Sequence, residues 1–202
     1  MVFIISWLAV MFPLVFSPGP ANIMFAANGA SVGIRKSFPL MLGVDSVLLI
    51  KSILVGAGLG STLAVYPEVI VYFQVVGSLY IFWLALKFIK PLNKTASTQA
   101  SYIGFKDGII LQLFNSKGWL MVILMFTLFT DQSAKEYGEY GIAIMVVMLF
   151  GLNIVTHIVW IGMGALIIKL ITKSSYLKYV NYSFALSLVL VGLWLLSDVL
   201  FK

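Results

Sequence analysis

Long apolar runs separated by short polar segments make up most of this 202-residue chain. A bilayer core of about 30 Å needs roughly 20 apolar residues per helix. Runs of at least this length predict transmembrane helices over residues 2–33, 38–65, 69–89, 103–129, 140–170 and 176–200, with loops that include 93–101 and 131–139. The pattern therefore predicts an all-α polytopic membrane protein with six transmembrane helices in a single domain, residues 1–202.

The first apolar run is interrupted by Pro18-Gly19-Pro20. Each proline lacks an amide N–H and clashes with the preceding helical turn, so we predict that the helix breaks at Pro18. Inside a bilayer such a break is stable only where it faces protein or a wet cavity. Many carriers bind a substrate anion at the bare N-terminus of a half-helix. Pro18, Gly19 and Pro20 are therefore predicted substrate-binding residues, and Asn22, in the first turn after the break, is predicted to contact the substrate.

Asp45 and Asn115 are expected at a similar depth in the membrane as this break, counting 1.5 Å per residue from the basic residues that flank their helices. A carboxylate at that depth is costly and usually has a function. We predict that Asp45 binds a substrate ammonium, the coupling proton, or both. The alternative is that Asp45 is a structural partner of Lys51 or Lys117.

Three more polar side chains fall within predicted helices. Asn153 and His157 are one turn apart on the same helical face. Histidine changes its charge near neutral pH, so His157 is a candidate proton relay, with a neutral hydrogen-bonding role as the alternative; Asn153 is a candidate substrate contact. For Lys51 the sequence leaves three possibilities open: a substrate carboxylate, an acidic group on another helix, or a place along a cavity wall.

Composition and charge narrow the class further. The chain is 61% hydrophobic and 10% charged, with a mean hydropathy of +1.07, whereas soluble domains carry about 25% charged residues. Cysteine is absent, which excludes disulfides, thiolate catalysis and cysteine-bound metals. The net charge of +6 comes from residues spread over short loops, so we predict no nucleic-acid binding. Basic residues mark cytoplasmic loops. Here they gather in the loops between the first and second, third and fourth, and fifth and sixth helices, so we predict that both termini lie outside. These residues are Arg35, Lys36, Lys87, Lys90, Lys94, Lys106, Lys169, Lys173 and Lys178.

Weak internal similarity suggests two halves, about residues 1–92 and 103–202. A shift of 98 residues aligns residues 16–18 with 114–116, and a shift of 108 aligns 43–47 with 151–155. Three helices per half make the second half inverted in the membrane relative to the first, as in many carriers. Chance alignment of apolar sequence is the alternative.

Two groups of residues resemble the signatures of the lysine-exporter (LysE/RhtB) family of amino-acid efflux transporters. The first comprises Pro18-Gly19-Pro20, Gly29, Gly33, Arg35, Gly43 and Asp45, and the second comprises Phe105, Gly108 and Asn115-x-Lys117. The resemblance implies export of amino acids or similar solutes driven by the proton gradient, with Asn115 and Lys117 as substrate-binding residues. Ser116 replaces the usual proline of the second signature and Ser37 a common glycine, so the sequence leaves open whether the fourth helix is broken.

Taken together, we expect a secondary transporter of the bacterial cytoplasmic (inner) membrane. Its partners are a small amino-acid-like substrate, protons and the lipid bilayer, with no cofactor and no metal site. The oligomeric state stays open, a homo-oligomer included. A cation or metal transporter or channel of related architecture is the alternative. An intramembrane enzyme is disfavoured, because His157 with Ser46 or Ser61 is its sole candidate set and there is no Gly-x-Ser-x-Gly motif.

Overall fold

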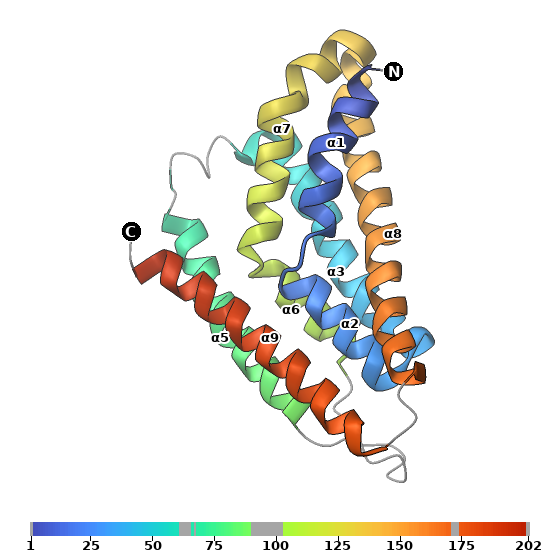
Figure 1. Ribbon diagram of the computed structural model, residues 1–202. Coiled ribbons are helices and arrows are strands. Elements are labelled where there is room, and N and C mark those ends of the chain that lie inside the picture. Colours follow the sequence, from blue (N-terminus) through green and yellow to red (C-terminus); the bar gives the residue numbers. More distant parts are fainter. Residues whose placement is uncertain (1, 61–65, 67, 90–102, 171–173, 201–202) are drawn as a thin grey trace.

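The protein is helical throughout the part of the chain that the computed structural model describes, residues 2–60, 66, 68–89, 103–170 and 174–200, and these residues form no strand. The order of elements is α1 (Val2–Phe16), α2 (Pro20–Val32), α3 (Ile34–Leu54), η1 (Val55–Leu59), α5 (Glu68–Ile89), α6 (Phe105–Leu113), α7 (Ser116–Tyr137), η2 (Gly138–Tyr140), α8 (Gly141–Leu170) and α9 (Ser174–Leu200) (Figure 1). The predicted loop 93–101 lies outside the described residues.

Four helical stretches are long and apolar enough to cross a membrane: Ile34–Gly58, Glu68–Lys87, Ser116–Leu170 and Tyr179–Ser197. The bent pair Val2–Phe16 and Pro20–Val32 adds a fifth if it forms one span. Length and composition therefore give four to five candidate spans among the described residues, and this count does not confirm the six that we predicted. One of these stretches, Ser116–Leu170, contains the turn at Gly138 where the chain reverses between α7 and α8 (Figure 1).

Two predicted helix limits are wrong. Helix α7 continues to Tyr137, so most of the predicted loop 131–139 is helical. Polar residues do not end a helix that has left the apolar layer, and this one ends at Gly138, whose φ of 58° suits glycine. The second predicted helix begins earlier than residue 38. The chain turns at Gly33, which has a φ of 80°, and α3 begins at Ile34, so Arg35 and Lys36 belong to its first turn.

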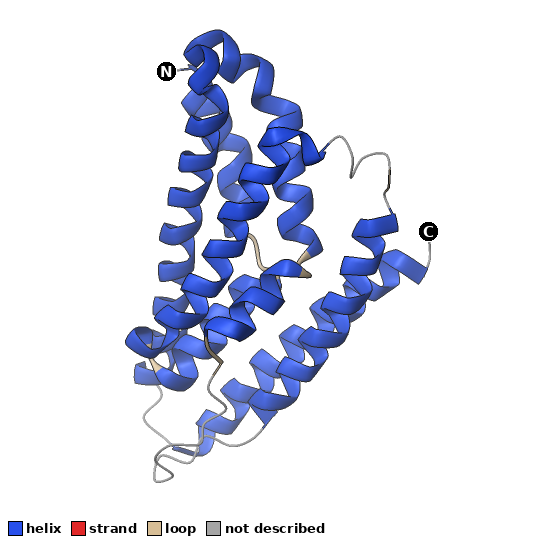
Figure 2. Ribbon diagram, turned by 180° about the vertical axis from the view of Figure 1, so that it is seen from behind, coloured by secondary structure: helices blue, strands red, loops and turns tan. Residues whose placement is uncertain are grey.

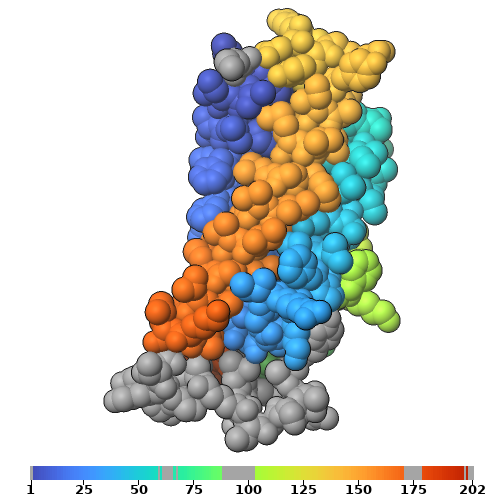
Figure 3. Space-filling model, turned by 90° about the vertical axis from the view of Figure 1, so that its right-hand side faces the viewer, coloured from blue at the N-terminus to red at the C-terminus, as the bar shows by residue number. Residues whose placement is uncertain are grey.

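Helices α5 and α9 lie side by side and lean away from α1 and α7 (Figures 1 and 2). On another face α8 runs across the molecule between α1 and α3 (Figure 3). The apolar core has two parts. The upper cluster, named for its place in Figure 1, joins α1, the end of α3, α7 and the start of α8, and it includes Phe3, Trp7, Met11, Val15, Trp119, Met125, Phe126, Phe129 and Met145. The lower cluster joins α2, α5, α6, α9, the start of α3 and the end of α8, and it includes Phe25, Leu40, Val44, Ile81, Leu84, Leu111, Ile161 and Leu188.

Glycines bring backbones into direct contact around the lower cluster. A Cβ atom at Gly29 would lie 2.1 Å from the carbonyl oxygen of Ile161, and one at Gly164 would lie 1.8 Å from that of Ala26, so α2 and α8 touch through their main chains. Gly43 and Gly108 join α3 to α6 in the same way, with main-chain oxygens 2.2 and 2.4 Å from the Cβ positions. Small residues allow this approach between membrane helices.

Candidate functional site

The predicted break at Pro18 is present. Helix α1 ends at Phe16, α2 begins at Pro20, and the two helices are bent by 58°. Pro20 occupies the first turn of α2, where its missing N–H costs no helical hydrogen bond. The break exposes the N-terminus of α2 at one side and the C-terminal carbonyls of α1 at the other.

A second break separates α6, which ends at Leu113, from α7, which begins at Ser116. Asn115 is the N-cap of α7, and its side-chain oxygen accepts a hydrogen bond from the backbone N–H of Gly118 at 3.3 Å. Asparagine is among the best N-cap residues. The fourth predicted helix is therefore broken even though Ser116 stands where the resemblance leads us to expect proline.

Side chains from other helices bind the carbonyls freed at the first break. Lys117 donates from Nζ to the main-chain oxygen of Ser17 (2.9 Å) and to its Oγ (2.8 Å). Asn22 donates from Nδ2 to the oxygens of Val15 (2.8 Å) and Ser17 (2.9 Å). Trp160 of α8 donates from Nε1 to the oxygen of Phe16 at 3.2 Å. The C-terminal end of α1 is thus capped by three side chains, one of them cationic, which suits its negative dipole end.

Lys51 performs the same task at the second break. Its Nζ donates to the main-chain oxygen of Gln112 and, at 3.4 Å, to that of Asn115. The ammonium also lies 4.3 Å from the ring centre of Trp119, and Lys51 is 1% exposed. Among the described residues, the hydrogen-bond partners of Lys51 are these two carbonyls at the second break, and none of the ion pairs includes it, so the structure does not support an acidic partner on another helix.

Asp45 of α3 faces His157 of α8, with Oδ1 and Nδ1 2.7 Å apart. Both residues are 3% exposed, and the His157 ring packs against Phe25 at 4.3 Å between centroids. The distance is that of an ion pair, although its angles are not those of a hydrogen bond, and both carboxylate oxygens lack hydrogen bonds to the residues described. The alternative of Lys51 or Lys117 as the partner of Asp45 is therefore wrong, because His157 is the partner.

The two breaks and this pair lie in one polar layer between the two core clusters. Val15 and Trp119 belong to the upper cluster, and Ala21 and Leu111 to the lower one. A pocket in this layer has a cavity volume of about 30 Å³, room for roughly two water molecules. Its lining residues are Val15, Gly19, Pro20, Ala21, Asn22, Gln112, Asn115, Lys117, Gly118, Met121, Asn153 and His157.

Most of the predicted site residues meet in this pocket: Gly19, Pro20, Asn22, Asn115, Lys117, Asn153 and His157. Pro18 and Asp45 do not line it, and Asp45 touches it through His157. The sequence analysis did not identify Gln112, whose Oε1 accepts a hydrogen bond from Asn115 Nδ2 at 2.9 Å. Gln112 lies one helical turn before Asn115 in the sequence, and this spacing could have indicated that the two side chains are neighbours. Within the described residues, no three His, Cys, Asp or Glu side chains gather as a metal site would need.

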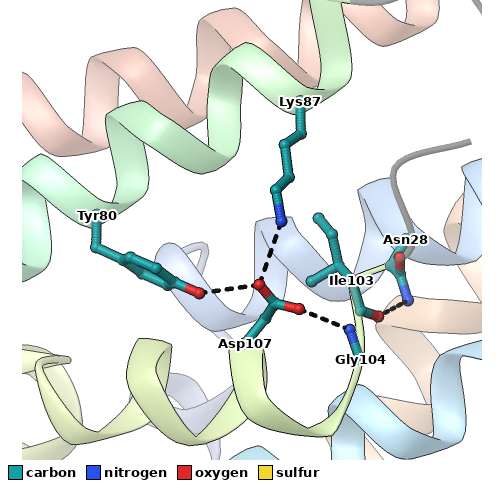
Figure 4. Close-up of polar contacts among 6 residues, drawn as sticks. All are labelled: Asn28, Tyr80, Lys87, Ile103, Gly104 and Asp107. Atoms are coloured by element: carbon teal, nitrogen blue, oxygen red, sulfur yellow. Dashed lines mark hydrogen bonds and ion pairs between the residues drawn. The ribbon is translucent and has the colours of Figure 1, made fainter.

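Asp107 forms a second polar cluster that the sequence analysis also missed (Figure 4). Its Oδ1 accepts a hydrogen bond from the Tyr80 hydroxyl at 3.1 Å and lies 3.3 Å from Lys87 Nζ, while Oδ2 accepts from the Gly104 N–H at 2.9 Å. Nearby, Asn28 donates to the carbonyl of Ile103 at 3.4 Å (Figure 4). The cluster ties α5 and α2 to the start of α6, away from the pocket. An acidic residue in the first turn of a helix was the signal for it.

Comparison with known proteins places this geometry in a family. The sequence matches the model for LysE type translocators over residues 12–199. It is 24% identical to the homoserine/homoserine lactone efflux protein of Salmonella typhi over 192 aligned residues, and the alignment covers 91% of each chain. It is 26% identical over 120 residues to the cysteine/O-acetylserine efflux protein of Klebsiella pneumoniae, covering 59% of this chain and 61% of that one.

A membrane protein of Vibrio cholerae that is described as uncharacterized is 26% identical over 176 residues, 81% of this chain and 82% of the other. No solved structure matches the chain. Since the family model spans nearly all of the sequence and the relatives with a described role are efflux proteins, the chain belongs to the family of LysE type translocators.

Proposed function

We propose that this protein is a secondary transporter that exports amino acids or similar small solutes across the bacterial inner membrane in exchange for protons. The relatives named as efflux proteins act on homoserine, its lactone, cysteine and O-acetylserine, all of them small amino-acid-like molecules. The observation that carries the proposal is the polar pocket, which lies at two helix breaks and includes one member of a buried aspartate–histidine pair.

The pocket suits a carboxylate because two helix N-termini face it. Ala21 and Asn22 lie in the first turn of α2 and Gly118 lies in the first turn of α7, where its N–H donates to the Asn115 side chain; all three residues line the pocket. The first N–H groups of a helix have no partner within the helix and carry a partial positive charge. The Lys117 ammonium lies in the same wall. In this proposal the substrate carboxylate binds between the two N-termini and draws Lys117 toward it.

The pair of Asp45 and His157 supplies the coupling. With neutral histidine the pair has a charge of −1 and attracts the substrate ammonium, and a bound proton makes the pair neutral. Inside a low-dielectric protein that difference is large. The substrate ammonium and the proton therefore compete for the negative charge of this pair. Such competition is required if the protein is to exchange substrate for protons. The amide groups of Asn153 and Asn115, both in the pocket wall, orient the ammonium.

We further propose six spans in two inverted halves, 1–92 and 103–202, within one domain, with both termini outside. The turn at Gly138 divides the 55-residue stretch Ser116–Leu170 into two antiparallel spans. Each half has a helix break, and a helix of each half caps the break of the other: Lys51 of α3 binds the end of α6, and Trp160 of α8 binds the end of α1. Alternating access then requires the halves to rock about the pocket.

Transport by the purified protein in liposomes tests the proposal. A pH gradient should drive accumulation of at least one radiolabelled amino acid, and Asp45→Asn should abolish this accumulation while the protein remains folded. Asp131→Asn is the matched control, because it makes the same chemical change at an exposed position. Transport by Asp45→Asn at the wild-type rate would remove the pair from coupling. Failure of every amino acid to cross would refute the proposed function.

A further inference from the structure

We infer that an apolar groove beside the pocket accepts the side chain of the substrate, so that the preferred substrates are amino acids with apolar side chains. This inference rests on the proposed function and specifies its substrate class. The groove is lined by residues of α1, α5, α7 and α9. Its lining residues are Leu14, Gln74, Ser116, Lys117, Leu120, Met121, Leu124, Trp194 and Leu195.

Size is the first argument. The pocket, at about 30 Å³, does not hold a whole amino acid, whereas the groove has a cavity volume of about 180 Å³. Lys117 and Met121 line both cavities, so the two are separated by these side chains. A substrate whose charged groups lie in the pocket therefore has space for its side chain in the groove.

The partition is a movable side chain. The Lys117 stem crosses the first break so closely that a Cβ atom at Gly19 would lie 3.0 Å from its Cδ and 3.1 Å from its Nζ. Of the described residues, Ser17 alone holds its ammonium, through the main-chain oxygen and Oγ. A substrate carboxylate is a stronger partner for an ammonium than a neutral oxygen. Rotation of Lys117 toward the substrate joins the pocket to the groove.

The chemistry of the groove selects the side chain. Apart from Ser116 and Lys117 at one end of α7, its walls are leucine, methionine and tryptophan, and the polar amide of Gln74 already donates to the carbonyl of Leu195 at 2.9 Å. None of the described residues that line the groove or the pocket has a carboxylate. A lysine or arginine side chain would meet the Lys117 cation and find no counter-charge, which is costly at this depth. An apolar side chain displaces no polar contact.

A membrane lipid is the other conceivable occupant, since Leu120, Leu124 and Trp194 are exposed. Lys117 and Met121, however, line both the groove and the pocket. A substrate bound in the pocket reaches the groove directly, which favours the substrate side chain over an acyl chain.

Competition in liposomes tests the inference. Unlabelled alanine, 2-aminobutyrate, norvaline, leucine and lysine compete with one labelled substrate, and the inhibition constants are compared. We expect affinity to rise roughly fourfold per buried methylene, with leucine far better than alanine and lysine weakest. Leu124→Trp fills the groove and should lower the leucine-to-alanine affinity ratio at least tenfold. Leu128→Trp, one turn further along α7 and also exposed (51% against 38% for Leu124) but outside the groove, should leave the ratio unchanged.

Equal affinities across the series, or lysine as the best competitor, would overturn the inference and leave amino-acid export intact. Loss of all transport in wild-type protein would instead refute the proposed function. If Leu124→Trp does not fold, Leu124→Ala replaces it, and the wider groove should improve binding of phenylalanine relative to leucine. A lipid that mass spectrometry finds bound to the wild type, absent from Leu124→Trp and not displaced by leucine, would assign the groove to lipid and also overturn the inference.

Discussion

The two ends of the helical bundle are closed in different ways. Around the lower cluster, α2 meets α8 and α3 meets α6 through glycine, with main chain against main chain. In the upper cluster, α1 packs against α7 and α8 through large side chains such as Phe3, Trp7 and Met125, all fully buried, and α7 approaches α8 closely only near the turn, at Ser133 and Gly141. Main-chain contacts have no rotamers to change, whereas methionine and aromatic side chains repack with small movements. The comparison suggests that the upper end opens more readily, and the lower end serves as the hinge.

The largest expected effect is at the glycine contacts. Gly164→Ala places a methyl group 1.8 Å from the main-chain oxygen of Ala26, and backbone atoms cannot move aside as side chains do. We expect a loss of about 3 kcal/mol in the free energy of unfolding, the upper part of the range for overpacking. Thermal unfolding of the purified protein in detergent measures this change.

Gly162→Ala is the matched control on the same helix. A Cβ atom there has no neighbour within 4 Å among the described residues, and alanine favours the helix by about 1 kcal/mol over glycine. This variant should be neutral or slightly more stable. Equal destabilisation by both substitutions would show that the close backbone contact at Gly164 is not the cause, because Gly162 has no such contact.

A smaller effect is expected at the upper cluster. Met125→Ala removes a fully buried side chain and should cost about 2 kcal/mol, but it should also make the upper end open more often. The chain has no cysteine, so a single Met121→Cys in the pocket reports access without background. Labelling of this cysteine by a thiol reagent added to the upper side should become several-fold faster in the Met125→Ala background.

Leu40→Ala is the comparison for the lower cluster, because Leu40 is also 0% exposed. It should destabilise the protein to a similar degree and leave the labelling rate unchanged from either side. If Leu40→Ala increases labelling as much as Met125→Ala does, the two ends open equally well and the contrast between them does not hold.

The sequence predicted the parts of this architecture that depend on local chemistry. Two prolines around Gly19 break the first helix whatever surrounds them, and that break is present. The second break was left open, because it depends on the Asn115 cap and on Lys51, which reaches the end of α6 from another helix. The helix propensity of residues 112–118 cannot predict the contact with Lys51, which is about 60 residues away in the sequence.

The same limit applies to the site. Helical periodicity placed Asp45 at depth and put Asn153 and His157 on one face, but it does not say which helices are neighbours. The pairing of Asp45 with His157 follows from α3 packing beside α8. For this reason the sequence suggests Asp45 and His157 as candidates for proton coupling without predicting their contact, and it offers a lysine partner for Asp45 only as the alternative. Residues 131–137 were misassigned for a related reason: a polar sequence marks the edge of the membrane and not the end of the helix.

The smallest effect tests whether charge also holds the lower end. Asp107→Asn keeps one oxygen that can accept from the Gly104 N–H and places an amide NH2 that can donate to the Tyr80 hydroxyl oxygen, but it removes the negative charge beside Lys87. The side chains of Lys87 and Asp107 are 23% and 19% exposed, so solvent screens the pair and its loss should cost about 1 kcal/mol or less. A double-mutant cycle with Tyr80→Phe separates the hydrogen bond from the charge. If Asp107→Asn destabilises the protein as much as Gly164→Ala, then an electrostatic contact holds the lower end, and backbone packing around the glycines is secondary.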